Sequence, residues 1–458
     1  MTLSLTGEQI HNTTLAIDGS GHMSIEARAG SGKTFQLQLI HQALPPILTR
    51  QIIYFGKANA NEAQTKGLPA RTSHSIGMEI CRENLSNRVK VNKHKWYNIL
   101  EKTINDLDEE DRPQLKDAVR LVSYLYELQI GTGCSDSIIA DRAAFLGVPP
   151  LPAAFFQNAF QQSITLATSR GELSFSDMLV LPVLFQWPYR THLDLLCVDE
   201  AQDTAHLQRE FYKLIGAERT IGVGDPYQSL YAFRGADNNA FELFKEEFPG
   251  SSGALTMSFR CAKAGIREAQ TIVPDIMAMP NAPEGIVAEK PLTISALRPG
   301  DAVLCRNNRP LVSLALQALR QGKRVTIRGK DYAEYLLRII KELPGSTAAE
   351  KLSHFDAQKI HTLSKISEHA RPMVEDRWDT VQALLEDNLS DPARITALFS
   401  DEDRTDVPVL STIHKAKGLE WRRVWLIHKE LLDLSDQQDL NALYVAITRM
   451  REEFYYAV

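Results

Sequence analysis

The chain has 458 residues, a formal net charge of −6 and 44% hydrophobic residues, values typical of a large folded protein with two or more domains. The acidic balance excludes nucleic-acid binding through overall basicity, so such a contact needs a local groove. No apolar run is long enough to span a bilayer and the first ten residues do not resemble a signal peptide, so we expect a cytoplasmic protein without membrane contact. Five scattered cysteines lack the spacing of a metal site or disulfide framework.

The first informative segment is ARAGSGKT, residues 27–34, which follows an apolar strand pattern and precedes a predicted helix near Lys33. This context is the one that a phosphate-binding loop requires. Lys33 would reach the outer phosphates and the Thr34 hydroxyl would bind Mg²⁺. Ala27 stands where the usual pattern has its first glycine. The predicted nucleotide-contacting residues of this loop are Ala27, Arg28, Ala29, Gly30, Ser31, Gly32, Lys33 and Thr34.

The second informative segment is VDEAQD, residues 198–203, at the end of an apolar strand pattern. Asp199 can hold a metal ion and Glu200 can polarise a water molecule. Either segment alone has an ordinary interpretation, a glycine-rich turn before a helix or an acidic helix start. The two in this order predict a nucleoside triphosphatase that uses Mg²⁺.

Further along the chain, apolar strand patterns alternate with helical stretches, which favours parallel sheets with helices on both faces. The expected strands are 51–55, 195–198, 220–223, 255–257, 302–305, 325–328, 409–413 and 424–427, with a last strand at the end of the chain. They fall into two sets, the second starting after a charged linker at 239–250. Residues 78–168 and 331–402 lack such patterns and are predicted to be mainly helical.

The predicted fold is α/β, with two parallel-sheet cores each interrupted by a helical insertion. The expected domains are residues 1–78 and 172–247 for the first core, 79–171 for its insertion, 248–330 and 403–458 for the second core, and 331–402 for a second insertion.

Ten segments in order resemble the UvrD/Rep-type superfamily 1A DNA helicases, which have two RecA-like cores. They are LTGEQ (5–9), YFGKANANEA (54–63), TSHS (72–75), SFSDML (174–179), VDEAQD (198–203), VGDPYQSLYAFRGA (223–236), LTMSFRC (255–261), LCRNN (304–308), STIHKAKGLEW (411–421) and LYVAITR (443–449).

This resemblance implies ATP as the nucleotide and assigns roles at its site. Gln9 matches a glutamine that reads adenine, and Phe259 an aromatic ring placed against it. Arg260 and Arg449 match arginines that reach the γ-phosphate from the second core. The resemblance thus implies that hydrolysis occurs between the two cores. Gln228 matches a γ-phosphate sensor and Glu420 a residue near the ribose. The alternative for Gln9 is an ordinary polar residue near a helix start. The alternative for Arg449 is a charged residue on the surface.

The resemblance also implies a track of single-stranded DNA. Bases would stack on aromatic rings without sequence preference. Phe55 ends an apolar strand pattern, so a core position is its alternative. An RNA track stays open, because stacking does not distinguish the sugars. The residues matching DNA contacts are Phe55, Lys57, Thr72, His74, Tyr231, Phe233, Arg234, Asn308, Thr412 and His414.

Two features depart from the family or lie outside its motifs. The second insertion is small for the family, and only nine residues follow Arg449, so we expect no nuclease domain there. A basic run precedes Trp96 and consists of Arg88, Lys90, Lys93 and Lys95. It either binds the phosphates of duplex DNA or forms a solvated helix face beside a core tryptophan.

We therefore expect an ATP-dependent 3′ to 5′ helicase that acts on single-stranded DNA and on junctions with duplex. The alternative is an ATP-gated single-strand-binding module that unwinds little and serves a protein partner. A P-loop kinase or transporter ATPase leaves YAFRGA, IHKAKGLEW and Arg449 without roles.

Overall fold

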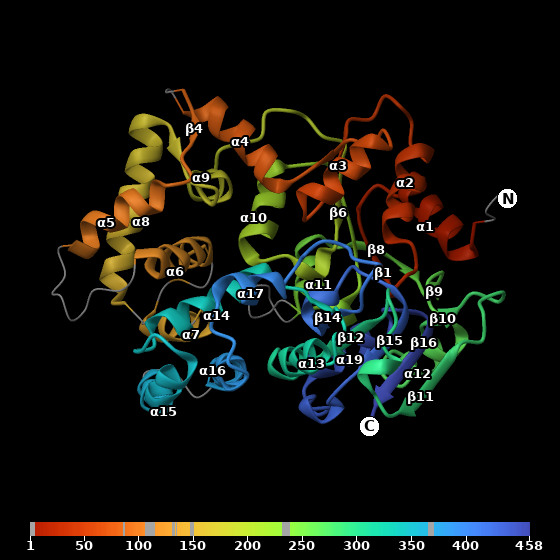
Figure 1. Cartoon of the computed structure of the whole chain (residues 1–458). Coiled ribbons are helices and arrows are strands. Elements are labelled where there is room, and N and C mark those ends of the chain that lie inside the picture. The colour runs from red at the N-terminus through yellow and green to blue at the C-terminus, as the bar shows by residue number, and fades with distance from the viewer. Residues whose placement is uncertain are drawn as a thin grey trace. The chain divides into compact units, whose positions relative to one another are not determined.

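Figure 1 shows the computed structural model of the chain, which divides into two compact units. The first unit comprises residues 1–27, 32–226 and 231–255, and the second comprises residues 28–31, 227–230 and 256–458. The structure describes residues 5–85, 88–105, 115–130, 133, 135–146, 151–230, 239–364 and 371–458.

Among its described residues, the first unit is built on a six-stranded sheet in the order β3-β2-β6-β7-β1-β8. Every neighbouring pair is parallel, so the carboxyl ends of the strands meet at one edge, where α/β proteins bind ligands. The strands are β1 (His22–Ala27), β2 (Arg50–Ile53), β3 (Ala70–Arg71), β6 (Leu195–Asp199), β7 (Arg219–Gly224) and β8 (Gly250–Leu255).

Strand β6 shows why the sequence is apolar there. All its residues are buried, because helices cover both faces of a parallel sheet. Leu195 and Cys197 pack with the residues of α2, whereas Leu196 and Val198 pack on the opposite face. The strand therefore ends by placing Asp199 at the carboxyl edge.

The helices of the first unit include those that cover this sheet and those of the predicted insertion, and Figure 1 shows them in red to yellow-green. They are α1 (Gly7–Asp18), α2 (Lys33–Ala43), α3 (Lys57–Thr65), α4 (Ser73–Asn84), α5 (Lys95–Asn105), α6 (Leu115–Leu128), α7 (Asp136–Leu146), α8 (Ala153–Arg170), α9 (Asp177–Phe185), α10 (His206–Ile215) and α11 (Ala240–Glu247), with 3₁₀ turns at Ala201–Asp203 and Pro226–Gln228. The short strands β4 (Lys90–Val91) and β5 (Glu172–Leu173) pair in parallel.

The second unit repeats this plan with another six-stranded parallel sheet among the described residues, in the order β11-β16-β15-β12-β14-β13. Its strands are β11 (Ile286–Lys290), β12 (Ala302–Cys305), β13 (Thr326–Ile327), β14 (Val409–Thr412), β15 (Trp421–Leu426) and β16 (Met450–Ala457), beside the separate pair β9 (Met257–Ser258) and β10 (Met277–Ala278). Its helices are α12 (Lys263–Ala269), α13 (Arg309–Arg320), α14 (Lys330–Glu342), α15 (Ala348–Ser364), α16 (Arg371–Glu386), α17 (Pro392–Ala397), α18 (Ile413–Ala416) and α19 (Gln437–Ile447), with 3₁₀ turns at Ile294–Ala296 and Lys429–Leu431.

These elements confirm two parallel-sheet cores with helical insertions, and they correct one strand assignment. The strand predicted at residues 255–257 in the second set is divided: Leu255 ends β8, which pairs with β1 in the first sheet, and Met257 begins β9 in the second unit. The rest of β8 is not among the predicted strands. Its segment GSSGAL is polar and largely exposed at a sheet edge, so it lacked the apolar signal of a buried strand. The four predicted domain ranges stay a prediction. Among the described helices, none is long and apolar enough to cross a membrane.

Candidate functional site

The loop between β1 and α2 has the backbone that a phosphate cradle requires. Gly30 and Gly32 have φ angles of 72° and 85°, a region that favours glycine. A Cβ atom on Gly30 would also lie 2.7 Å from Arg260 Cβ and 2.8 Å from Ser258 Oγ. Helix α2 then begins at Lys33, so its N-terminal N–H groups and dipole favour an anion at this loop.

Ser31 supplies an independent test of the fit to a phosphate. The residue is only 1% exposed, and its Oγ atom has no hydrogen-bond partner among the described residues. A buried hydroxyl without a partner is costly. A phosphate oxygen at the loop would satisfy it, so the residues present fit the group that the sequence implies.

The two acids and the loop lysine are brought together in the first unit. Lys33 Nζ lies 3.5 Å from Glu200 Oε2. Burial, and then the charge of Glu200, raise the pKa of Asp199 to about 7, although the Lys33 charge and a hydrogen bond from Thr34 oppose this shift. A divalent cation would offset the cost of two adjacent carboxylates, and Thr34 and Asp199 are the residues that would hold it.

Gln9 lies beside the same loop. Its Nε2 atom is 3.9 Å from the position of a Cβ atom on Gly32. Its Oε1 atom accepts a hydrogen bond of 3.0 Å from Thr6 N, and together they form a capping box at the start of α1. Gln9 therefore caps its helix, as its ordinary alternative requires, and its role toward adenine stays a prediction.

The second unit groups the predicted arginines with Gln228 and Glu420. Arg449 is 1% exposed and donates to Leu419 O, to Val445 O and, over 3.3 Å, to Gln228 Oε1. The surface-charge alternative for Arg449 is therefore wrong. Arg260 forms an ion pair with Glu420, which also pairs with Arg451.

The segment of residues 28–31 is held within this second unit. Arg28 forms a 2.6 Å ion pair with Asp275, and the N–H group of Ala29 donates to the Tyr444 hydroxyl over 3.0 Å. The N–H group of Phe259 donates to Gly30 O over 2.9 Å, while the Phe259 ring stays 42% exposed. An exposed ring remains available for stacking.

The DNA candidates of the first unit differ in accessibility. Phe55 is 58% exposed, directly after the buried Tyr54, so its core alternative is wrong. Lys57 is exposed, and the Thr72 side chain caps α4. Burial lowers the pKa of His74 to about 4, which keeps its ring neutral near pH 7.

The DNA candidates of the second unit already have structural partners. The Asn308 amide and backbone N–H both donate to Asp376. The Thr412 side chain caps α18, on which His414 lies half-buried. Tyr231, Phe233 and Arg234 lie outside the described residues. All ten DNA contacts stay predictions.

The basic run near residue 90 does not offer a row of free cations. Lys95 is buried and forms a 2.6 Å ion pair with Asp177, and Lys90 pairs with Glu172. Trp96 lies in the core, as the alternative predicted, but Lys95 is not on a solvated face.

The structure draws attention to two residues of the quoted segments that were given no role from the sequence. Gln202, in VDEAQD, is fully buried beside Glu200. Phe175, in SFSDML, is 63% exposed, and its ring centroid lies 4.5 Å from that of His74. An amide inside an acidic segment and an aromatic before a helix start were the available signals.

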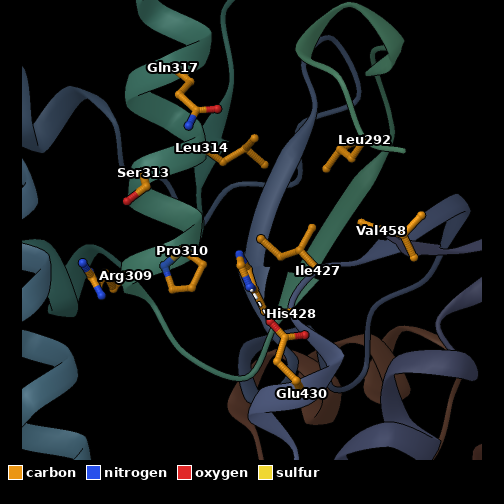
Figure 2. Close-up of a pocket in the computed structure, with 11 residues that line it drawn as sticks. Leu292, Arg309, Pro310, Ser313, Leu314, Gln317, Ile427, His428, Glu430 and Val458 are labelled. Atoms are coloured by element: carbon orange, nitrogen blue, oxygen red, sulfur yellow. Dashed lines mark hydrogen bonds and ion pairs between the residues drawn. The ribbon is translucent and has the colours of Figure 1, made fainter. Parts of the chain in front are cut away.

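The second unit also contains a cavity of about 660 Å³ (Figure 2). Leu314 and Pro310 of α13 face Leu292 and Ile427 across it, and the ring of His428 contacts Glu430 over 2.8 Å at one end. None of the predicted site residues lines this cavity.

The strand, loop and helix at residues 22–43, with two acids at the end of a parallel strand, define a P-loop nucleotide-binding protein. The model of the UvrD/REP helicase N-terminal domain matches residues 8–249, and the model of the UvrD-like helicase C-terminal domain matches residues 409–455. The chain belongs to the UvrD/Rep helicase family.

Individual relatives match smaller parts. The ATP-dependent DNA helicase Rep of Buchnera aphidicola subsp. Schizaphis graminum is 26% identical over 41% of this chain and 30% of its own length. The F-box DNA helicase protein 1 of Schizosaccharomyces pombe is 25% identical over 57% of this chain and 33% of its own length. The match thus spans about a third of these curated relatives. The solved structure of an arterivirus nonstructural protein 10 (helicase) aligns with 98% of this chain and with 61% of its own chain, at 11% sequence identity. The TM-score is 0.37, so no conclusion is based on this likeness.

Proposed function

We propose that this chain is an ATP-dependent DNA helicase that moves 3′ to 5′ on single-stranded DNA and separates the duplex ahead of it. The observation that carries the proposal is the grouping of Lys33, at the start of α2, with Asp199 and Glu200, at the end of β6, in the first unit. Membership of the UvrD/Rep family supports DNA as the track, and the names of two relatives include ATP-dependent DNA helicase activity.

The chain's own residues have the following roles in the proposed hydrolysis. Backbone N–H groups of residues 28–32 and the side chain of Lys33 bind the phosphates. Thr34 and Asp199 would hold Mg²⁺, which would supply neutralisation of the charge that develops on the transferred phosphoryl group. Glu200 orients the attacking water and accepts its proton.

The two arginines of the second unit have the complementary role. Arg260 and Arg449 stabilise negative charge on the γ-phosphate, a contribution that is typically worth about 10³ to 10⁵ in rate. Gln228 reports the state of the γ-phosphate, a role supported by the hydrogen bond that its Oε1 atom accepts from Arg449. Gln9 and Phe259 recognise adenine, and Glu420 contacts the ribose.

We assign DNA contact to the predicted residues, of which Thr412 is buried and the other described ones are exposed or half-buried. Phe55 stacks with bases, Lys57 contacts phosphate, and Thr72, His74, Asn308, Thr412 and His414 contact the strand. Tyr231, Phe233 and Arg234 complete the proposed platform.

Strand displacement tests the proposal. Matched duplexes carry a 3′ tail, a 5′ tail or no tail, and Lys33→Ala serves as the control. We expect ATP-dependent displacement from the 3′ tail alone, with no displacement by Lys33→Ala. Single-strand-stimulated hydrolysis without displacement would favour the ATP-gated binding module instead, and displacement from the 5′ tail would overturn the polarity.

A further inference from the structure

Gln202 joins the acidic segment to the end of the neighbouring strand. Its Nε2 atom donates to Glu200 Oε2 over 2.6 Å, and its Oε1 atom accepts from the backbone N–H of Asp225 over 3.0 Å. The side chain is 0% exposed. Both polar ends of this buried amide therefore have defined partners, which is the condition for a rigid orientation.

The surrounding backbone leaves room for this amide. A Cβ atom on Gly224 would overlap Gln202 Oε1, so only glycine permits the contact at that position of β7. Glu200 itself has a φ angle of 55°, an uncommon value for a residue with a side chain. The strained backbone and the buried amide together determine where the Glu200 carboxylate points.

Lys33 also contacts that carboxylate, 3.5 Å from the same Oε2 atom. In the proposed function, bound nucleotide draws Lys33 to its phosphates. The amide of Gln202 is a neutral donor to Glu200, and a neutral donor orients a general base without cancelling its charge.

We propose that Gln202 is a positioning residue for ATP hydrolysis, which holds the Glu200 carboxylate toward the attacking water and ties it to the backbone at Asp225. This inference rests on the proposed function. It separates two roles within VDEAQD: Asp199 and Glu200 act on the metal ion and the water, and Gln202 acts through Glu200.

The test is a double-mutant cycle of Gln202→Met and Glu200→Gln, measured as steady-state hydrolysis with saturating single-stranded DNA. Methionine keeps the volume and removes both hydrogen bonds. We expect kcat to fall about 10- to 100-fold for Gln202→Met, as for a misplaced reacting group, while the Kd for a fluorescent ATP analogue changes less than about threefold. In the Glu200→Gln background the second substitution should have no further effect on kcat. Additive losses, or a kcat for Gln202→Met within twofold of wild type, would overturn the inference.

A second variant keeps the test independent of packing. Gln202→Glu retains an acceptor for the N–H of Asp225 but places a carboxylate against Glu200, so the acidic limb of the kcat–pH profile should shift to higher pH. An unshifted limb contradicts the inference. Gln208→Met is the matched control, because Gln208 caps α10 through a 2.9 Å bond from Ala205 N and has no contact with Glu200 among the hydrogen bonds of the described residues. It should leave kcat and the profile unchanged.

The proposed function fails separately, if wild-type protein shows no DNA-stimulated hydrolysis. The contact between Gln202 and Glu200 is then tested without measuring hydrolysis. The same double-mutant cycle is carried out with the midpoint of urea unfolding of the nucleotide-free protein as the measured quantity. Coupled shifts support the positioning contact, and additive shifts overturn it.

Discussion

Two buried aspartates of the first unit have opposite surroundings. Asp177 receives hydrogen bonds from Lys95 Nζ at 2.6 Å and from the Tyr126 hydroxyl at 2.8 Å, and further bonds from Ser163 and Ser174. Asp199 adjoins the carboxylate of Glu200, whose charge raises the pKa of Asp199, and the charge of Lys33, which pairs with Glu200, opposes this shift.

The difference separates a structural carboxylate from one prepared for a ligand. The chain itself compensates the charge of Asp177, so this residue connects α5, α6 and α8 to α9. The charge of Asp199 is compensated only in part, and its pKa is raised to about 7. A buried acid whose compensation is incomplete is a candidate for metal binding.

The largest effect should come from Asp199→Asn. We expect kcat for DNA-stimulated hydrolysis to fall about 10³-fold or more, because the metal's electrostatic contribution is worth several kcal/mol. Urea unfolding should show no loss of stability. The matched control is Asp177→Asn, which should destabilise the fold but keep turnover per folded molecule. Comparable turnover by the two folded variants would contradict the contrast.

The next effect concerns the structural pair. Lys95→Met leaves Asp177 buried without its cation, and we expect the free energy of unfolding to fall by about 3–5 kcal/mol. Chemical denaturation measures this loss. The double variant Lys95→Met/Asp177→Leu removes both charges and should recover part of the stability. A double variant less stable than the single one would show that the surrounding hydroxyl groups dominate.

A smaller effect is a pH dependence that arises from Asp199. The folded-state pKa of Asp199 is about 7 and lies above its ordinary value of 3.8. Protonation of Asp199 therefore stabilises the folded state relative to the unfolded state. This stabilisation is fully present below pH 3.8 and is lost as pH rises through 7. With chelator present, wild type should lose about 2–3 kcal/mol relative to Asp199→Asn between pH 5 and 7. If the free energy of unfolding changes with pH in the same way for the two proteins, this interpretation is wrong.

The smallest effect extends the contrast to neighbouring aromatic residues. Tyr54 is buried and Phe55 is 58% exposed, so Phe55→Ala should weaken single-strand binding by about 1–3 kcal/mol with little change in stability. Fluorescence anisotropy at one fixed salt concentration measures this loss. Ile47→Ala, at a residue 87% exposed, is the matched control and should leave binding unchanged. Equal losses for both variants would argue against a specific stacking role.

Local patterns were enough to predict much of this protein. The strand, loop and helix around Lys33 and the buried strand ending at Asp199 are where they were expected, because glycine positions, apolar runs and terminal acids act over a few residues. Weak local signals failed. The polar edge strand β8 was not predicted apart from its last residue, Leu255, which was assigned to the second set of strands. Lys95 was grouped with surface cations although it is buried.

The sequence by itself determined the family, the order of the strands and helices and the residue types at the nucleotide loop. Tertiary structure alone decided which polar groups have partners. Gln202 and Gln9 are both amides in recognised segments, yet one orients a neighbouring acid and the other caps a helix. Asp177 and Asp199 are both aspartates in such segments, and only their surroundings distinguish them. The reason is physical: the cost of burying a charge or amide depends on the dielectric environment and on partners contributed by distant parts of the chain.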